Sequence, residues 1–393
     1  MLRKFGLLPR IITAIILGIL IGSISPQWLI KIFSTFNGIF GNFLGFVIPL
    51  IIIGFIAPGI AEMGKGAGKM LGITTLIAYG STITAGLLAF VAGLAFLPSF
   101  ISGYRLEEME NPEEFLQQPF FQIDMPPLMG VMSALLLSFI LGIGMAVIKG
   151  DALQQVFVNF RQIIEKLISK VIIPLLPFHI FGIFANMTYG GQVAFILSVF
   201  AKVFALIIAL HITMLFIQYV TSGAIARKNP LKLLKVMLPA YFTALGTQSS
   251  AATIPVTLRQ VKQTGVQEKV ADFTVPLLAT IHLSGSTITL VSCAMGVILL
   301  NGQMPDFASI FPFILMLGIT MIAAPGVPGG AVMASLGLLE SMLGFNQTML
   351  TLMIALYLAQ DSFGTATNVT GDGALTVLVN KITKSKKEQA LSA

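Results

Sequence analysis

The chain has 393 residues, of which 56% are hydrophobic and only 10% are charged, and its formal net charge is +7. Soluble domains carry about a quarter of charged residues, so this composition excludes a soluble protein and indicates one that crosses a membrane many times. The positive charge does not indicate a nucleic-acid partner, because the basic residues lie at the ends of apolar runs and follow membrane topology.

Six apolar runs without charged residues follow one another in the first part of the chain. Each is long enough for a membrane span of about 20 residues. They cover residues 11–28, 32–61, 70–104, 125–148, 171–201 and 203–226. Residues 151–170 are amphipathic with mixed charge, which predicts a helix lying on the inner membrane interface.

Two of the later runs are interrupted in the middle. Gly246-Thr-Gln-Ser-Ser-Ala-Ala-Thr-Ile-Pro255 interrupts 236–258, and Ala324-Pro-Gly-Val-Pro-Gly-Gly330 interrupts 307–339. Proline and glycine at this density stop a helix, and free backbone in a membrane must be buried by protein or a water-filled cavity. We therefore predict two re-entrant hairpins. A full helix follows each of them, at 273–300 and 341–380, which indicates inverted repeats whose hairpin tips meet near the midplane.

The distribution of basic residues predicts the topology. With eight spans, two hairpins and a cytoplasmic N-terminus, nearly all of the 23 basic residues are cytoplasmic, and Lys31, Arg105 and Lys202 are left outside. This agrees with the positive-inside rule. We expect an integral protein of the inner or plasma membrane with both termini in the cytoplasm and a solvated acidic loop, 107–114, outside.

The last apolar run contains two aspartates. On an ideal helix Asp361, Thr365, Asn368 and Asp372 fall in a stripe about 60° wide. An aspartate near the bilayer centre costs about 2.5–3.5 kcal/mol on insertion scales, so a carboxylate that stays ionised there needs a cationic partner. This stripe therefore indicates a binding site for Na⁺ or an ammonium group.

A broken helix can bind both ends of a zwitterion. The free N–H groups of a half-helix attract a carboxylate, and unwound carbonyls coordinate a cation. Ser249 and Ser250 add hydroxyl groups at the first tip, and Asp361 can hold an ammonium group. The residues thus indicate an α-amino acid, with Asp372 and Asn368 left for Na⁺, although the serines could instead bond only to helix backbone. The isolated His179 and His211 are interpreted as packing residues.

Three motifs in order, Gln248–Thr257, Gly326–Gly329 and Asn368–Asp372, resemble those of the dicarboxylate/amino acid:cation symporter family, the glutamate transporter relatives. The likeness spans nearly the whole chain. It implies an all-α homotrimer with an elevator mechanism. It also implies a trimerisation scaffold, at 8–62, 126–148 and part of 171–226, and a mobile transport core, at 70–97, 230–258, 271–300, 307–345 and 347–381.

The resemblance also implies site residues. Those expected at the substrate are Gln248, Ser249, Ser250, Ser286, Val327, Asp361, Gly364, Thr365 and Asn368. Those expected at Na⁺, several through their backbone, are Leu278, Thr280, His282, Met321, Ile322, Ala324, Asn368 and Asp372. A third cation position would use Tyr79, Thr82 and Ser284, but it lacks its anion because the family's Asn-Met-Asp-Gly-Thr is His282-Leu-Ser-Gly-Ser286 here.

Two departures from the family pattern predict the specificity. Gly364 stands where members with acidic substrates carry an arginine, and Gln248 stands where some relatives carry another. Without a guanidinium the substrate is expected to be a neutral amino acid such as serine, threonine or alanine, with the space vacated at Gly364 free for something larger.

The change to His282 predicts fewer coupled Na⁺ ions and makes this residue a candidate proton carrier, since an imidazole titrates near physiological pH. Three alternative functions stay open: a proton-coupled symporter for amino acids or dicarboxylates, an uncoupled exchanger, or a channel. An enzyme is not expected, because no metal-ligand cluster or catalytic grouping is visible, and no cofactor is predicted besides the coupling ion, Na⁺ or H⁺.

Overall fold

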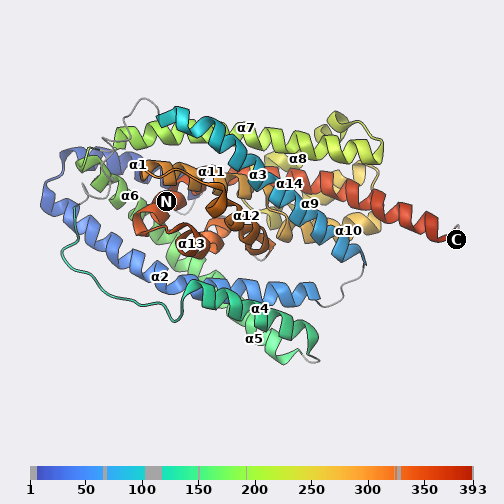
Figure 1. Cartoon of the computed structure of the whole chain (residues 1–393), viewed down its shortest axis with the longest axis horizontal. Helices are drawn as coiled ribbons and strands as arrows, with labels where there is room; N and C mark the ends of the chain where they lie inside the picture. The colour runs from blue at the N-terminus through green and yellow to red at the C-terminus, as the bar shows by residue number, and fades with distance from the viewer. Residues whose placement is uncertain are drawn as a thin grey trace.

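The computed structural model describes residues 7–64, 69–101, 117–148, 151–191, 193–322, 324 and 329–391. The regular structure of these residues is helical, which confirms the all-α prediction. The acidic loop 107–114 and Val327 lie outside the described residues. The helices (Figure 1) are α1 (Leu7–Ile24), α2 (Gln27–Gly64), α3 (Lys69–Ile101), α4 (Val131–Val147), α5 (Ala152–Leu167), the π-helical turn η4 (Ile168–Ile172), α6 (Ile173–Tyr189), α7 (Val193–Ala226), α8 (Pro230–Thr247), α9 (Ser250–Gln263), α10 (Glu268–Ile281), α11 (Ser284–Leu300), α12 (Phe307–Ile322), α13 (Gly330–Leu343) and α14 (Gln347–Leu391).

Several helical segments could cross a membrane. By length and composition, five of them in the described part of the chain are long and apolar enough. They are Gln27–Ala61, Met70–Phe100, Ala152–Tyr189, Leu197–Ala226 and Glu268–Leu300. The last differs from the others because its most apolar window is entirely buried inside the protein, so it is covered by other helices.

The helices form two packing groups. One contains α1, α2, α4, α5 and α6, in which α1 packs on α6 and α2 packs on the other three. The second contains α3 and α7 to α14, with α11 and α14 packed against each other and against α3 and α7. In Figure 1, α2, α4 and α5 form one edge of the molecule and α7 the opposite edge. All 17 residues of α11 are buried, so this helix lies at the centre.

Two predicted span boundaries are wrong. Lys31 and Lys202, which ended runs in the sequence, both lie inside helices. The chain breaks instead at Pro26 and near Gly191, whose φ of 78° favours glycine. Each lysine lies over a ring, and the ammonium group of Lys202 also donates to the Phe100 carbonyl oxygen at 2.7 Å. A long side chain can thus extend away from an apolar helix to a polar partner, so its charge need not end the helix.

The predicted interfacial segment, 151–170, is helical but is not a separate element. It runs through η4 directly into α6. Phe157, Phe160 and Ile164 of α5 pack into the apolar core, and Ile164 lies against Gly54 of α2. This helix is therefore attached to the first packing group along one side.

The helix breaks differ in part from those predicted. The first hairpin turns at Gln248 and Ser249 only, and Pro255 lies inside α9. The second break separates α12 from α13, as expected. The predicted continuous helix 273–300 is wrong, because the chain leaves the helix at His282 and Leu283 and begins α11 at Ser284. No proline or glycine lies at this third break, so only tertiary contacts could reveal it.

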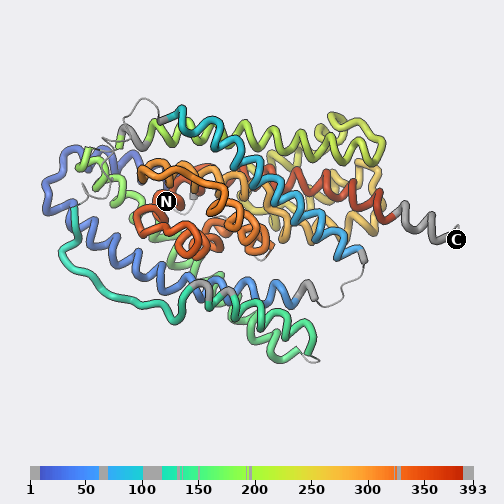
Figure 2. The backbone as a smooth tube through the Cα atoms, in the orientation of Figure 1, coloured from blue at the N-terminus to red at the C-terminus, as the bar shows by residue number. Residues whose placement is uncertain are grey.

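Residues 117–130, which we call the strap, are extended and follow α2 (Figure 2). The Phe120 N–H donates to the Thr35 hydroxyl at 2.9 Å, and the Asn42 amide donates to the Ile123 carbonyl at 2.8 Å. Asn186 of α6 accepts from the Gln117 N–H at 2.9 Å and donates to Ser34 of α2 at 2.7 Å. Side chains of two helices thus replace the hydrogen bonds that an extended segment lacks.

We expect Asn186→Ala to release the start of the strap, because the Gln117 N–H loses its acceptor. One such bond is worth about 0.5–1.5 kcal/mol net, so hydrogen exchange of the Gln117 amide should accelerate by up to about tenfold. Asn42→Ala is the matched control, since it removes a bond at Ile123 only. Equal exchange of Gln117 in both variants would contradict this account.

Candidate functional site

The polar stripe of α14 bonds to two helix breaks, the second hairpin and the break between α10 and α11. Asp361, Asn368 and Asp372 are buried, with exposed fractions of 5%, 2% and 1%. Asp361 bonds to the second hairpin, while Asn368 and Asp372 bond to the two sides of the break between α10 and α11, at the first turn of α11 and at His282. Thr365 is buried between them at 6%. The stripe predicted from helix geometry is therefore an interior surface rather than the wall of an open vestibule.

Asp361 holds the end of the second hairpin. Its Oδ2 accepts from the Gly329 N–H at 2.7 Å. Gly329 precedes α13 with φ of 74°, and a Cβ there would lie 2.9 Å from Leu358, so both conformation and space require glycine. Tyr357 is buried one turn before Asp361. The first N–H of a half-helix is thus held directly on the carboxylate expected to bind an ammonium group.

The side chain of Asn368 is bonded to α11. Its Oδ1 accepts from the N–H groups of Gly285 and Ser286, at 2.7 and 3.3 Å, and its Nδ2 donates to the Ser286 hydroxyl at 2.9 Å. These N–H groups belong to the first turn of a helix and have no partner within it. The Asn368 amide therefore caps α11, and any contact with a cation would come from its backbone carbonyl.

Asp372 bonds to His282 at the end of α10. The His282 Nδ1 donates to Asp372 Oδ1 at 2.8 Å, and both side chains are almost fully buried. On the other side of the ring, Nε2 lies 3.1 Å from the Ser81 hydroxyl and 3.3 Å from the Gln218 amide nitrogen. Both ring nitrogens of His282 therefore lie within hydrogen-bond distance of polar partners.

One oxygen of this carboxylate stays open. Asp372 Oδ2 has no hydrogen-bond partner in the described part of the chain, and neither have Gln218 Oε1 and the Thr370 hydroxyl. A buried carboxylate oxygen without a partner is costly, and a cation would satisfy it. A hard cation such as Na⁺ would therefore fit at Asp372 Oδ2.

The residues expected at the second cation position lie close together but use their side chains elsewhere. Leu278, Ile281 and Ile322 share one apolar cluster, which joins α10 to the end of α12. The Thr280 hydroxyl donates to the Leu277 carbonyl of its own helix at 2.7 Å. Met321 and Ala324 flank the same break and are buried. Only backbone carbonyls remain here as cation ligands.

The three hydroxyl groups expected at the third cation position bond to other residues. The Tyr79 hydroxyl donates to the Leu315 carbonyl at 3.2 Å, and the Thr82 hydroxyl donates to the Ala78 carbonyl at 3.0 Å. Ser284 accepts from the Gln218 amide at 3.2 Å. The three hydroxyl groups thus have three separate partners.

The first hairpin tip is built by local capping. Gln248 has a left-handed φ of 54°, and its N–H donates to the Ala244 carbonyl. The Ser249 hydroxyl accepts from the Ala252 N–H at 3.2 Å, which is an N-cap bond for α9. Ser250 begins α9 and is 7% exposed. Both arms of this hairpin pack along α14.

The space expected at Gly364 is not open. A Cβ built on Gly364 would lie 3.5 Å from the backbone of Gly285 and Ser286. In the opposite direction, a Cβ on Gly285 would clash with the Gly364 carbonyl oxygen and lie 2.7 Å from Thr367 Cβ. The expectation of vacated space is therefore wrong, because α11 and α14 cross here backbone to backbone.

Three polar residues at this site were not predicted from the sequence. Ser81 and Gln218 bond to His282, as described above. His211 was interpreted as a packing residue, yet its Nε2 bonds to the Gly285 carbonyl at 3.0 Å. For Gln218 and His211, the only sequence signal was a polar residue inside an apolar run of α7. Such a signal does not reveal which residues the side chain contacts.

The sequence has known relatives. The profile of a family described as the sodium:dicarboxylate symporter family matches residues 7–382. A protein named Serine/threonine transporter SstT, from Acinetobacter baumannii, is 26% identical over 394 residues, which covers 96% of this chain and 97% of the relative. Its counterparts in strains AYE and AB307-0294 have the same identity and coverage.

We expect Gly285→Ala to destabilise the protein and Gly364→Ala to be tolerated. The first adds a methyl group where α11 meets the α14 backbone, and overpacking of this kind costs about 1–3 kcal/mol. The second adds one at ordinary van der Waals distance. Thermal unfolding in detergent should show a Tm about 1–4 °C lower for Gly285→Ala only. Equal Tm values would contradict the close crossing.

Proposed function

The chain belongs to the sodium:dicarboxylate symporter family, and on this premise we propose that it carries a small neutral amino acid across the membrane together with Na⁺. Membership makes it a cation-coupled symporter and an integral membrane protein, not an enzyme. The substrate, the ion and the mechanism are the proposal. One observation carries it: a buried carboxylate, Asp361, bonded to the backbone at the second hairpin.

Asp361 is proposed to bind the substrate's ammonium group. It is buried, and it bonds to a backbone N–H that an opening hairpin would remove. A freed carboxylate needs a cationic partner at this depth. Ser249, Ser250 and the exposed N–H groups of the two hairpins would then receive the substrate's carboxylate.

The substrate's side chain is proposed to be uncharged. No lysine or arginine is among the buried residues of the described chain, so nothing there would neutralise a second carboxylate. Gly364 faces α11 and offers no charge either. The relatives named serine/threonine transporters support the same substrate class. We therefore favour serine, threonine or alanine.

The proposed Na⁺ position is at Asp372. Its open Oδ2 supplies an anionic ligand, and carbonyls at the α10 end and of Asn368 would complete the shell. His282 occupies the other oxygen, so fewer cations should bind than in a site with an additional carboxylate.

The proposed mechanism is an elevator movement. The first packing group would be the scaffold and the second the transport core, with α7 in the core because it packs on α14, α11, α3 and α8. Eight spans, two re-entrant hairpins, inverted repeats and a homotrimer remain part of this proposal, on the strength of the family resemblance.

An uncoupled exchanger on the same scaffold is the second candidate. The observation that favours it is the His282–Asp372 bond, which satisfies part of the carboxylate without any ion. A cation gradient that accumulates substrate would exclude it.

The decisive measurement is uptake by purified protein in liposomes under an inward Na⁺ gradient and, in parallel, an inward proton gradient. We expect the Na⁺ gradient to accumulate labelled serine above equilibrium, with threonine and alanine as better competitors than aspartate. Equilibration without accumulation would establish the exchanger. Accumulation driven by the proton gradient alone would overturn the assignment of Na⁺ as the coupling ion. Strongest competition by aspartate would overturn the assignment of a neutral substrate.

We expect Asp361→Asn to lower kcat/KM for serine by at least about tenfold, because a hydrogen bond to a charged group is worth about 1.5–3 kcal/mol. Asp306→Asn is the matched control: Asp306 is an exposed carboxylate that bonds to Ser309 at the start of α12. Similar uptake by both variants would rule out the assigned role of Asp361.

A further inference from the structure

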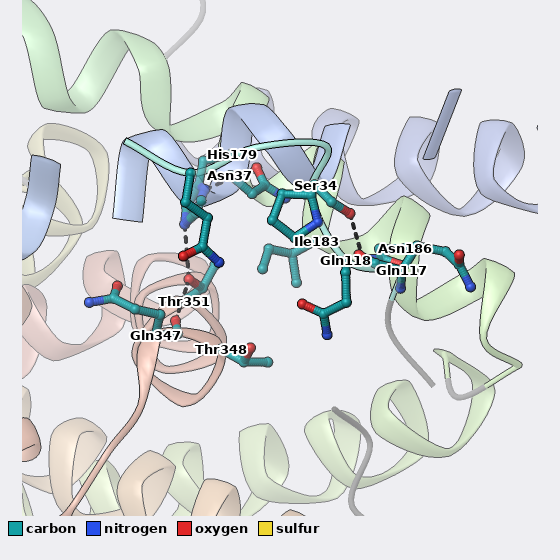
Figure 3. A pocket seen from close by; sticks show the side chains of 13 residues that line it. Ser34, Asn37, Gln117, Gln118, His179, Ile183, Asn186, Gln347, Thr348 and Thr351 are labelled. Atoms are coloured by element: carbon teal, nitrogen blue, oxygen red, sulfur yellow. Dashed lines mark hydrogen bonds between the residues drawn. The ribbon is translucent and has the colours of Figure 1, made fainter. Parts of the chain in front are cut away.

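A second polar site lies at the other end of α14. A cavity of about 270 Å³ opens where α2, α6, the strap and the first turn of α14 meet (Figure 3). Thr351, in its wall, precedes Asp361 by ten residues, which is about 15 Å along a helix. The cavity is therefore distinct from the proposed substrate position.

Most residues that line the cavity are polar, and none carries a fixed charge. Asparagine, glutamine, serine and threonine supply most of it, and none of its lining residues is Asp, Glu, Lys or Arg. His179 is its one titratable group. A charged ligand would find no counter-ion here, whereas an uncharged ligand would find both donors and acceptors.

The inner wall is a fixed chain of hydrogen bonds. The Asn37 amide nitrogen donates to His179 Nδ1 at 3.0 Å, and His179 Nε2 donates to the Thr351 hydroxyl at 2.9 Å. Thr351 donates in turn to the Gln347 carbonyl at 2.8 Å. Gly182 allows this arrangement, because a Cβ there would clash with the Asn37 amide. The wall joins α2, α6 and α14.

The mouth of the cavity has polar side chains that remain free to bind. Those of Gln118, Gln122, Gln347 and Thr348 make no hydrogen bond within the described structure, and the three glutamines are exposed. The Gln347 amide lies against α2, where a Cβ on Gly41 would come within 3.1 Å of its Oε1. Free amides at the mouth and fixed polar groups in the wall can together donate to and accept from a small polar molecule.

We infer that this cavity binds a small uncharged molecule rich in hydroxyl groups, of the polyol class. The volume corresponds to about nine water molecules, so the ligand is small. It would contact α14 through Gln347 and Thr348 and the other group of helices through Asn37 and the strap.

An occupant in this position holds α14 against α2 and α6. This second part rests on the proposed elevator movement, in which α14 leaves α6 and the His179–Thr351 bond breaks. A ligand that contacts both sides adds bonds that must break in the same step, so it slows transport without competing for the substrate.

The test uses single cysteines in the full-length protein. Gln118→Cys and Thr348→Cys place a thiol in the cavity, and Gln303→Cys places one in an exposed loop elsewhere; the native Cys293 is fully buried. The rate of modification by a neutral methanethiosulfonate is measured with increasing myo-inositol. At ten times its half-saturating concentration, myo-inositol should slow the cavity cysteines about tenfold and leave Gln303→Cys unchanged.

Charged probes of similar size, gluconate and glucosamine, should not protect. Protection that is absent, that does not saturate, or that is equal at Gln303→Cys would mean a water-filled cavity and overturn the site. Protection by the charged probes would overturn the ligand class.

Transport is then measured in the native chain. Saturating myo-inositol should lower the maximal rate of uptake with an unchanged KM. Protection of the cysteines without this effect would contradict the inference that the ligand keeps α14 against α2 and α6. The protection assay needs no transport, so failure of the proposed function would not be mistaken for failure of the site.

Discussion

The fold depends on satisfying backbone groups at helix breaks that lie inside an apolar body. Neither lipid nor apolar side chains can bond to a free N–H, so each break needs a polar side chain from a neighbouring helix. α14 supplies them for two of the breaks, while the first hairpin is capped by its own residues. Asp361 accepts from Gly329, Asn368 accepts from the first turn of α11, and Asp372 bonds to His282 where α10 ends. Because these partners stand on one helix, the second hairpin and the α10–α11 break are held in one register. The glycine crossing of α11 and α14 follows from this, since Asn368 can reach the α11 N–H groups only if the two backbones are close.

The same bonds connect structure with the proposed transport. The Asp361 carboxylate bonds to the hairpin N–H, and an ammonium group at the same carboxylate would share its negative charge with this bond. In the proposed mechanism, substrate binding and the position of the second hairpin are therefore linked. Asp372 differs, because one oxygen is taken by His282 and the other is open. An imidazole at this place supplies a hydrogen-bond donor to the carboxylate. The bond to His282 partly satisfies the Asp372 carboxylate and leaves its other oxygen for a cation. The strength of ion coupling depends on how far this bond replaces the cation.

The sequence predicted what local chemistry determines and missed what distant contacts determine. Glycine and proline marked the second hairpin and indicated the first within a few residues, although Gly246 and Pro255 lie inside its helices. Helical spacing placed the stripe on α14. The break at His282 carries neither residue. It exists because Asn368 and Asp372, more than 80 residues later, bond to the exposed groups. Gln218 and Ser81 could not be assigned for the same reason. From the sequence, Gly364 was interpreted only as the position of a missing arginine. In the structure, its position is determined by the close approach of the α11 backbone. The charges of Lys31 and Lys202 led to wrong span boundaries. Their flexible side chains reach polar or aromatic partners beside their helices.

α14 therefore has two polar regions with different partners. Its middle bonds to helices of its own packing group, while its first turns bond to α2 and α6 through His179 and Thr351. The hydrogen bonds in the middle of α14 would move together with this helix. Those at its first turns would be exchanged whenever the two packing groups move past each other. The His179–Thr351 bond is worth about 1 kcal/mol net in general terms, and the apolar packing around it can slide without leaving a buried polar group unpaired. Breaking this bond leaves an imidazole and a hydroxyl beside a cavity already lined with amides, so water can satisfy both. A polar cavity at this boundary thus lowers the cost of separation when it is empty and raises it when a ligand fills it.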